Sequence, residues 1–236
     1  MYKAIIDKHK NIELEPESHT YTLNNSDLEF SSVTEFINTF FAPFDELKIA
    51  NKLTQFKKYQ HMSTQDILQD WEQRRKRGTI VHKEIEDYVL FKKSMKLDPK
   101  SKQGVNFLQE KCMSNKNNLL FPEVKICSEK LHLAGTIDLM IYNKEKNKIY
   151  LIDWKTNVEI KKNGFKKGIK KSTQLIDDCS FNRYTLQLSM YQYILETYYN
   201  AAVDGLYIIH LKDDTYHTIK CDFEKTHITN MLQSVQ

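Results

Sequence analysis

Two acidic residues, Asp138 and Asp153, lie fifteen positions apart within stretches that are otherwise apolar. The polar run 143–148 between them predicts a turn that joins two antiparallel strands. If this hairpin is symmetric about positions 145 and 146, the two aspartates face each other with Cβ atoms ~4.5–5.5 Å apart, a separation that suits two carboxylates on one hard cation. Lys155, two residues after Asp153, points to the same strand face. Two acids and a lysine on one sheet face predict metal-assisted cleavage of a phosphodiester bond.

The alternative is an ordinary surface ion pair, because lone Asp and Lys residues in strands usually face solvent. The flanking runs 139–141 and 151–152 are apolar, however, and such runs indicate strands buried on both faces. A carboxylate placed there costs several kcal/mol unless it is paired or bound to a metal. The pattern therefore favours a functional site.

Further motifs occur in a fixed order around these residues. They are Gly78-Thr79-Ile80-Val81-His82, Glu123, Gly135-Thr136-Ile137-Asp138, Asp153-Trp154-Lys155 and Gln187-x-x-x-Tyr191. In this order they resemble the PD-(D/E)XK nuclease superfamily, and within it the RecB-like branch that includes phage and mitochondrial DNA exonucleases. The resemblance covers residues 78–211. The second acid is an aspartate where many relatives carry glutamate, and the superfamily pattern allows either.

The resemblance implies an α/β (α+β) protein with a restriction-endonuclease-like αβββαβ core, in which helices flank a mixed sheet. Residues 78–236 would form this core, and residues 1–77 an N-terminal extension of strands and helices. The implied activity is that of a Mg²⁺- or Mn²⁺-dependent deoxyribonuclease, a sequence-nonspecific exonuclease in DNA recombination, repair or processing. Two alternatives stay open: an endonuclease of the same fold, and a nucleic-acid-binding accessory subunit of a helicase complex.

The resemblance also assigns roles to single residues. Asp138, Asp153 and Lys155 would be catalytic. Metal ligands for one or two ions would be Asp138, Asp153, His82 and the backbone carbonyl of Trp154, with Glu86 and Glu123 as further candidates. Gln187 and Tyr191 would support the site, although Tyr191 also lies on an apolar helical stripe and is a candidate core residue. A helical histidine such as His82 is more often structural, and the motif context argues against that reading here.

Two basic clusters adjoin the catalytic motifs. Arg74, Arg75, Lys76 and Arg77 directly precede Gly78, and the second cluster consists of Lys161, Lys162, Lys166, Lys167, Lys170 and Lys171. Charge runs are usually solvated surface. Lysine and arginine contacts to phosphates give sequence-independent affinity. We therefore expect these clusters to bind DNA, either single-stranded DNA or strand ends, with Arg74, Arg75 and Arg77 among the contacts. A helicase or recombination partner would act in trans, since the chain contains no Walker A pattern.

Composition agrees with an intracellular enzyme, in the cytoplasm or in an organelle or nucleus. The 236 residues are 40% apolar and 28% charged, with no signal peptide and no apolar run of membrane-spanning length, so we expect neither secretion nor membrane partners. The cysteines, at positions 112, 127, 179 and 221, are scattered without a CxxC pair. We expect free, mostly buried thiols and no iron–sulfur cluster.

These motifs need a framework of helices and strands to position them. The pattern predicts strands over 20–23, 28–31, 119–128, 131–142, 148–155, 206–211 and 216–221, and helices over 32–41, 45–59, 100–113, 181–199 and 223–232. Ser63 and Asp66 resemble a capping box that opens another helix. Gly78 either interrupts this helix or starts a new one that ends near residue 91.

Overall fold

The computed structural model describes residues 2–15, 20–24, 26, 28–94 and 96–235. The helices are α1 Tyr2–His9, α2 Val33–Asn38, α3 Glu46–Leu53, α4 Thr64–Phe91, α5 Pro99–Phe107, α6 Ser180–Tyr198 and α7 Lys225–Gln233, with a 3₁₀ turn η1 Lys57–Tyr59 and a π-helical turn η2 Leu108–Met113. The strands are β1 Ile12–Glu15, β2 Thr20–Leu23, β3 Glu29–Ser32, β4 Asn118–Ser128, β5 Leu133–Asn143, β6 Lys148–Lys155, β7 Val203–Leu211 and β8 Tyr216–Cys221.

The eight strands form one mixed sheet in the order β1-β2-β3-β5-β6-β7-β8, with β4 paired to the other edge of β5. Both β3–β5 and β6–β7 are parallel, and the other pairs are antiparallel. Along one edge of β5, residues 133–134 pair with β3 and residues 139–143 pair with β6. Between them, at residues 135–138, the sheet forks, and we call this stretch the sheet fork.

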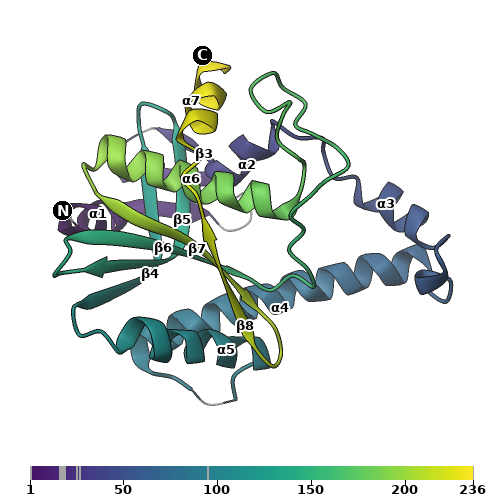
Figure 1. Ribbon diagram of the computed structural model, residues 1–236, viewed down its shortest axis with the longest axis horizontal. Coiled ribbons are helices and arrows are strands. Elements are labelled where there is room, and N and C mark those ends of the chain that lie inside the picture. The colour runs from purple at the N-terminus through teal and green to yellow at the C-terminus, as the bar shows by residue number, and fades with distance from the viewer. Residues whose placement is uncertain (1, 16–19, 25, 27, 95, 236) are drawn as a thin grey trace.

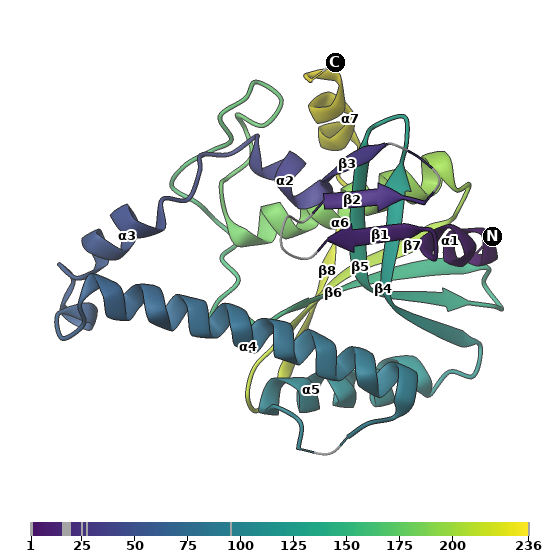
Figure 2. The same ribbon diagram turned by 180° about the vertical axis from the view of Figure 1, so that it is seen from behind.

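Helices cover both faces of this sheet (Figures 1 and 2). On one face, Val81 and Ile85 of α4 and Phe107 of α5 share a buried cluster with Leu139 of β5 and Trp154 of β6. On the other face, α6 and α7 bury their apolar residues against a second and larger cluster. The expected class, a mixed sheet flanked by helices, is confirmed, and whether its core is that of a nuclease stays a prediction.

Helix α4 is continuous over 28 residues and projects beyond the sheet toward α3 (Figure 1). Ser63 caps it by accepting from Asp66 N, and the Asp66 carboxylate completes the predicted capping box. Gly78 neither interrupts nor starts a helix, which corrects both expectations. A Cβ at Gly78 would lie 3.1 Å from Thr156 Oγ1, so the glycine lets the end of β6 approach the helix. The expected boundary at residues 77/78 lies inside α4.

The predicted elements from β4 to α7 are present, with bounds that differ by up to three residues. The expected helix over 100–113 changes at residue 108 to the π-helical turn η2. Helix α1 and strand β1 were not predicted, and the expected N-terminal extension contributes β1–β3 to the common sheet. All four cysteines are free and buried, as expected. No described helix has the length and apolarity needed to span a membrane.

Candidate active site

The β5–β6 hairpin has the predicted register. Its ladder runs from Asn143↔Lys148 to Leu139↔Ile152, centred on positions 145 and 146. The ladder ends one pair before Asp138 and Asp153, because β6 leaves β5 at the sheet fork and continues along β7. Asp138 Oδ2 accepts a hydrogen bond from Trp154 N at 2.7 Å and so satisfies a main-chain donor that the ladder no longer pairs.

Asp153 and Lys155 lie on one strand face, as predicted, and they form a buried ion pair. The Lys155 ammonium lies 2.7 Å from Asp153 Oδ1 and 4.5 Å from the ring centre of Tyr184. Burial raises the pKa of Asp153 to about 6, against the opposing charge of Lys155. Burial also acts to lower the pKa of Lys155, but the nearby aspartates outweigh it and raise that pKa. The other oxygen, Asp153 Oδ2, is buried and has no hydrogen-bond partner among the described residues.

Glu123 faces Asp138 from the middle of β4. It lies between the pairs Pro122↔Leu139 and Val124↔Ile137, and its backbone is left-handed with φ 49°. A non-glycine residue in this conformation is uncommon and is found preferentially at functional sites. Glu123 therefore lies within the strand and interrupts its ladder. Burial, followed by the charges of Asp138 and Glu86, raises the pKa of Glu123 to about 8.

Three side chains from three elements could hold a metal ion. His82 of α4, Glu123 of β4 and Asp138 of β5 each offer one ligand atom, and these atoms lie within 4.8 Å of one another. The His82 ring is also held by its neighbours, with Nε2 3.1 Å from the Trp154 carbonyl oxygen and Nδ1 3.6 Å from Asp138 Oδ2. If Nε2–H donates to that carbonyl, the Nδ1 lone pair is available to a metal.

Three of the expected ligands are not members of this group: Asp153, the Trp154 carbonyl and Glu86. Asp153 lies near enough for the charges of Asp138 and His82 to act on its pKa, whereas the Trp154 carbonyl contacts His82. Glu86 lies close enough to raise the pKa of Glu123, but its carboxylate binds Lys83 at 2.9 Å. Glu86 is thus an ion-paired neighbour of the group.

Gln187 and Tyr191 support the sheet fork from α6. Gln187 Nε2 donates to Tyr191 Oη at 3.1 Å, and the Tyr191 ring is buried in the core. A Cβ at Gly135 would lie 2.5 Å from Tyr191 Cε1, so only glycine admits this ring beside β5. Tyr191 is both a core residue and the packing partner of the motif that carries Asp138.

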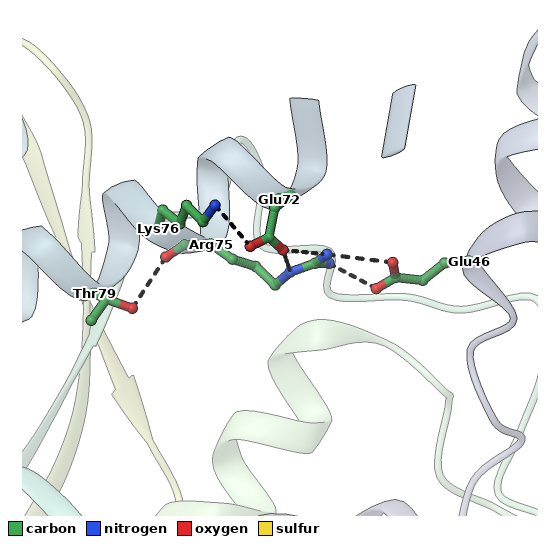
Figure 3. Close-up of polar contacts among 5 residues, drawn as sticks. All are labelled: Glu46, Glu72, Arg75, Lys76 and Thr79. Atoms are coloured by element: carbon green, nitrogen blue, oxygen red, sulfur yellow. Dashed lines mark hydrogen bonds and ion pairs between the residues drawn. The ribbon is translucent and has the colours of Figure 1, made fainter. Parts of the chain in front are cut away.

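The arginines of the cluster that precedes Gly78 form ion pairs with carboxylates. Arg74 binds Asp70 at 2.9 Å, and Arg75 lies between Glu72 and Glu46, which links α4 to α3 (Figure 3). The guanidinium of Arg77 binds Asp98 and Asp213. The expected contacts of Arg74, Arg75 and Arg77 with DNA stay predictions, and none of the three is a free cation.

The lysine cluster belongs to the long β6–α6 connection. Lys167 binds Asp177 at 2.6 Å, and Lys170 donates to Thr39 and lies 4.2 Å from the ring centre of Phe40. Lys162 lies 5.9 Å from the ring of Phe181. The remaining members, Lys161, Lys166 and Lys171, are exposed. Their expected role in DNA binding stays a prediction.

The structure also has a cleft of about 960 Å³, which the sequence did not indicate and whose lining follows or precedes site residues along the chain. Its lining includes Gly78 and Thr79 of α4 and residues 156–158, which follow Lys155. Each carbonyl of this segment receives a side chain: Lys100 Nζ at 2.6 Å from Thr156 O, His210 Nε2 at 2.7 Å from Asn157 O, and Lys212 Nζ on Val158 O. Lys100 comes from α5, and His210 and Lys212 come from the end of β7 and the residue after it. None belongs to a motif, so only the fold brings them together.

No family model matches this chain, and a search of curated proteins finds no match.

Proposed function

We propose that this protein is a metal-dependent deoxyribonuclease that hydrolyses phosphodiester bonds without sequence specificity. The observation that carries the proposal is the group of acids at the sheet fork. Glu123, Asp138 and Asp153 come from three neighbouring strands, and the buried Asp153 also binds Lys155. Clustered carboxylates disfavour one another's ionised forms, so a fold that serves only as a scaffold gains nothing from such an arrangement.

The donor set fits a hard divalent ion. Carboxylate oxygens of Glu123 and Asp138 are the ligands that Mg²⁺ and Mn²⁺ prefer, and the imidazole of His82 suits Mn²⁺ as well. The unpartnered Asp153 Oδ2 is a buried acceptor that a cation would satisfy. A bound Mg²⁺ or Mn²⁺ would lower the pKa of a coordinated water and offset negative charge on the phosphate.

The chain's own residues have separate tasks in this proposal. Lys155 brings a fixed positive charge to the site and would stabilise the negative charge that builds on the phosphate oxygens, or orient the attacking water. Asp153 holds the Lys155 ammonium through a 2.7 Å contact. The Trp154 amide orients the Asp138 carboxylate, and the Trp154 carbonyl orients the ring of His82.

We further propose that the enzyme is an exonuclease. The proposal starts from α4, which carries His82 and extends past the cleft to α3, to which Arg75 ties it. A free strand end can enter between α4 and the segment after Lys155, which together line the cleft. An endonuclease of the same fold and a binding-only accessory subunit are the competing possibilities, and an intact Asp153–Lys155 pair argues against the second.

The test is digestion of end-labelled single- and double-stranded DNA with Mg²⁺, Mn²⁺ or EDTA. We expect cleavage with either metal, none with EDTA, and release of label as mononucleotides or short oligonucleotides from one end. Binding without cleavage under every metal condition would favour the accessory-subunit possibility. Internal fragments that appear before any terminal product would favour an endonuclease.

A further inference from the structure

The cleft beside the site carries an excess of positive charge. Its basic lining residues are Arg74, Arg75, Arg77, Lys100 and Lys212, and its acidic ones are Asp70 and Asp213. Carboxylates already bind the three arginines. Within the described part of the chain, neither Lys100 nor Lys212 has an ion-pair partner, and each ammonium donates instead to a main-chain carbonyl.

A phosphate would be a better partner for these lysines than a carbonyl. The bond to a carbonyl has one charged partner, the ammonium, whereas a phosphate brings a second charge of opposite sign and adds a Coulomb attraction. Lys100 is also half-buried. Burial and then the charge of Arg77 lower its pKa, Asp213 and Asp98 oppose this, and Lys212 adds a smaller repulsion. An anion placed between Lys100 and Lys212 would relieve this repulsion.

The position of the cleft identifies the anion. Thr79 on its wall is three residues, or less than one helical turn, before His82, and Thr156 directly follows Lys155. A strand whose phosphate reaches the sheet fork would therefore place its next phosphates in the cleft. Since a nucleic-acid strand is a row of evenly spaced negative charges, it matches a cleft lined by several cations.

We propose that this cleft binds the sugar–phosphate backbone of single-stranded DNA next to the scissile phosphate, and that Lys100 and Lys212 are its phosphate contacts. On binding, the two ammonium groups move from the carbonyls of Thr156 and Val158 to phosphate oxygens. This inference rests on the proposed nuclease function, and it adds two contact residues outside both basic clusters.

The first test measures binding of a labelled single-stranded oligonucleotide in EDTA, where no cleavage occurs, over a range of salt. Lys100→Gln/Lys212→Gln removes both charges but keeps a donor for each carbonyl. We expect weaker binding and a salt slope smaller in magnitude by ~1.4, because each single-strand phosphate contact contributes ~0.7. Lys100→Arg/Lys212→Arg keeps both charges and should keep the slope.

The matched control is Lys116→Gln/Lys144→Gln, which removes two exposed lysines that do not line the cleft. It should bind as the unaltered protein does. An equal loss in the Gln pair and the control, or in the Gln and Arg pairs, would overturn the inference, as would failure of the unaltered protein to bind.

A second test needs no variant. Lys100 and Lys212 should be protected from acetylation when the oligonucleotide is bound, whereas Lys116 and Lys144 stay reactive. Unprotected Lys100 and Lys212 in a bound complex would also overturn the inference. If the protein digests DNA but neither lysine is protected, the cleft assignment fails and the nuclease proposal stands. If both lysines are protected but no metal-dependent digestion occurs, the cleft assignment stands and the nuclease proposal fails.

Discussion

At the scale of single residues, Asp138 and Asp153 have different environments, although the register of the β5–β6 hairpin would place them opposite each other. Asp153 is buried against Lys155, with one oxygen unpartnered, whereas Asp138 is partly exposed and fixed by the Trp154 amide and His82. Polar residues flanked by apolar ones could be found from the sequence. The order of the motifs also named His82 and Glu123 as candidates. That these two, and not Asp153, group with Asp138 could not be predicted, because it depends on how α4 and β4 meet at the sheet fork.

The first prediction concerns these acids. Asp138→Asn or Asp153→Asn should abolish cleavage with Mg²⁺ and Mn²⁺, because Asp138 belongs to the metal-binding group and Asp153 holds the Lys155 ammonium. Fold and DNA binding in EDTA should be retained. Asp214→Asn is the matched control, since Asp214 is exposed and distant in sequence from the motifs. The measurements are digestion rates and Mn²⁺ affinity from calorimetry. Full activity in either site variant would refute the assignment of that aspartate to the active site.

The second prediction separates the catalytic role of Lys155 from its structural role. Lys155→Ala should slow turnover by orders of magnitude and also lower the free energy of unfolding by about 3–5 kcal/mol, because it leaves the Asp153 carboxylate buried without its partner. Lys155→Ala/Asp153→Asn should recover much of that stability and none of the activity. Denaturant unfolding and digestion assays test both expectations. An equally unstable double variant would mean that the ion pair is not the cause.

At the scale of elements, local signals were predictable and long-range ones were not. The β5–β6 register follows from a polar turn between two apolar runs, so the sequence sufficed to predict it. Gly78 was misleading, because its helix penalty of ~1 kcal/mol relative to alanine is outweighed by the packing of Val81 and Ile85 on the sheet. Helix α1 was not predicted because Ile5 is its only buried residue, and one buried position gives no apolar periodicity.

The third prediction concerns the contact between α4 and α5. Asp98 caps α5 by accepting from Lys100 N, and it also binds Arg77 of α4 at 2.8 Å. Asp98→Asn keeps a good cap residue but removes the charge, so it should cost ~1–2 kcal/mol of unfolding free energy at pH 7. Because Arg77 is partly exposed and salt screens its charge, we expect the loss of unfolding free energy to lie toward the lower end of this range.

The pH dependence of this cost has a definite sign. The hydrogen bond from Arg77 lowers the pKa of Asp98 below its ordinary value of 3.8. Its stabilisation is therefore complete above pH 3.8 and is lost as the pH falls through the lowered pKa. Unfolding free energies of the two proteins should converge in acid and differ most near neutrality. A difference that is constant from pH 3 to pH 7 would contradict the ionic explanation.

At the scale of the whole molecule, the site depends on a fork that no local pattern encodes. Strand β3 pairs in parallel with the start of β5 across a hundred residues of chain, and β6 occupies the same edge further along. The gap between them exposes residues 135–138 to side chains from α4 and α6. The order of motifs named candidate residues, but only the tertiary pairing explains why some of them meet.

The fourth prediction concerns the route of the substrate. Helix α4 lies beside the segment after Lys155, and Gly78 brings the two within close contact at Thr156. In the proposed function the strand reaches the site along the cleft that these segments line, which a free end can do more readily than a closed loop. Covalently closed single-stranded circles should therefore survive conditions that digest the same DNA once it has been cut. The paired substrates have identical sequence and length, so a difference in rate reports the need for an end, whereas rapid cutting of the circles would favour an endonuclease that admits DNA from the side.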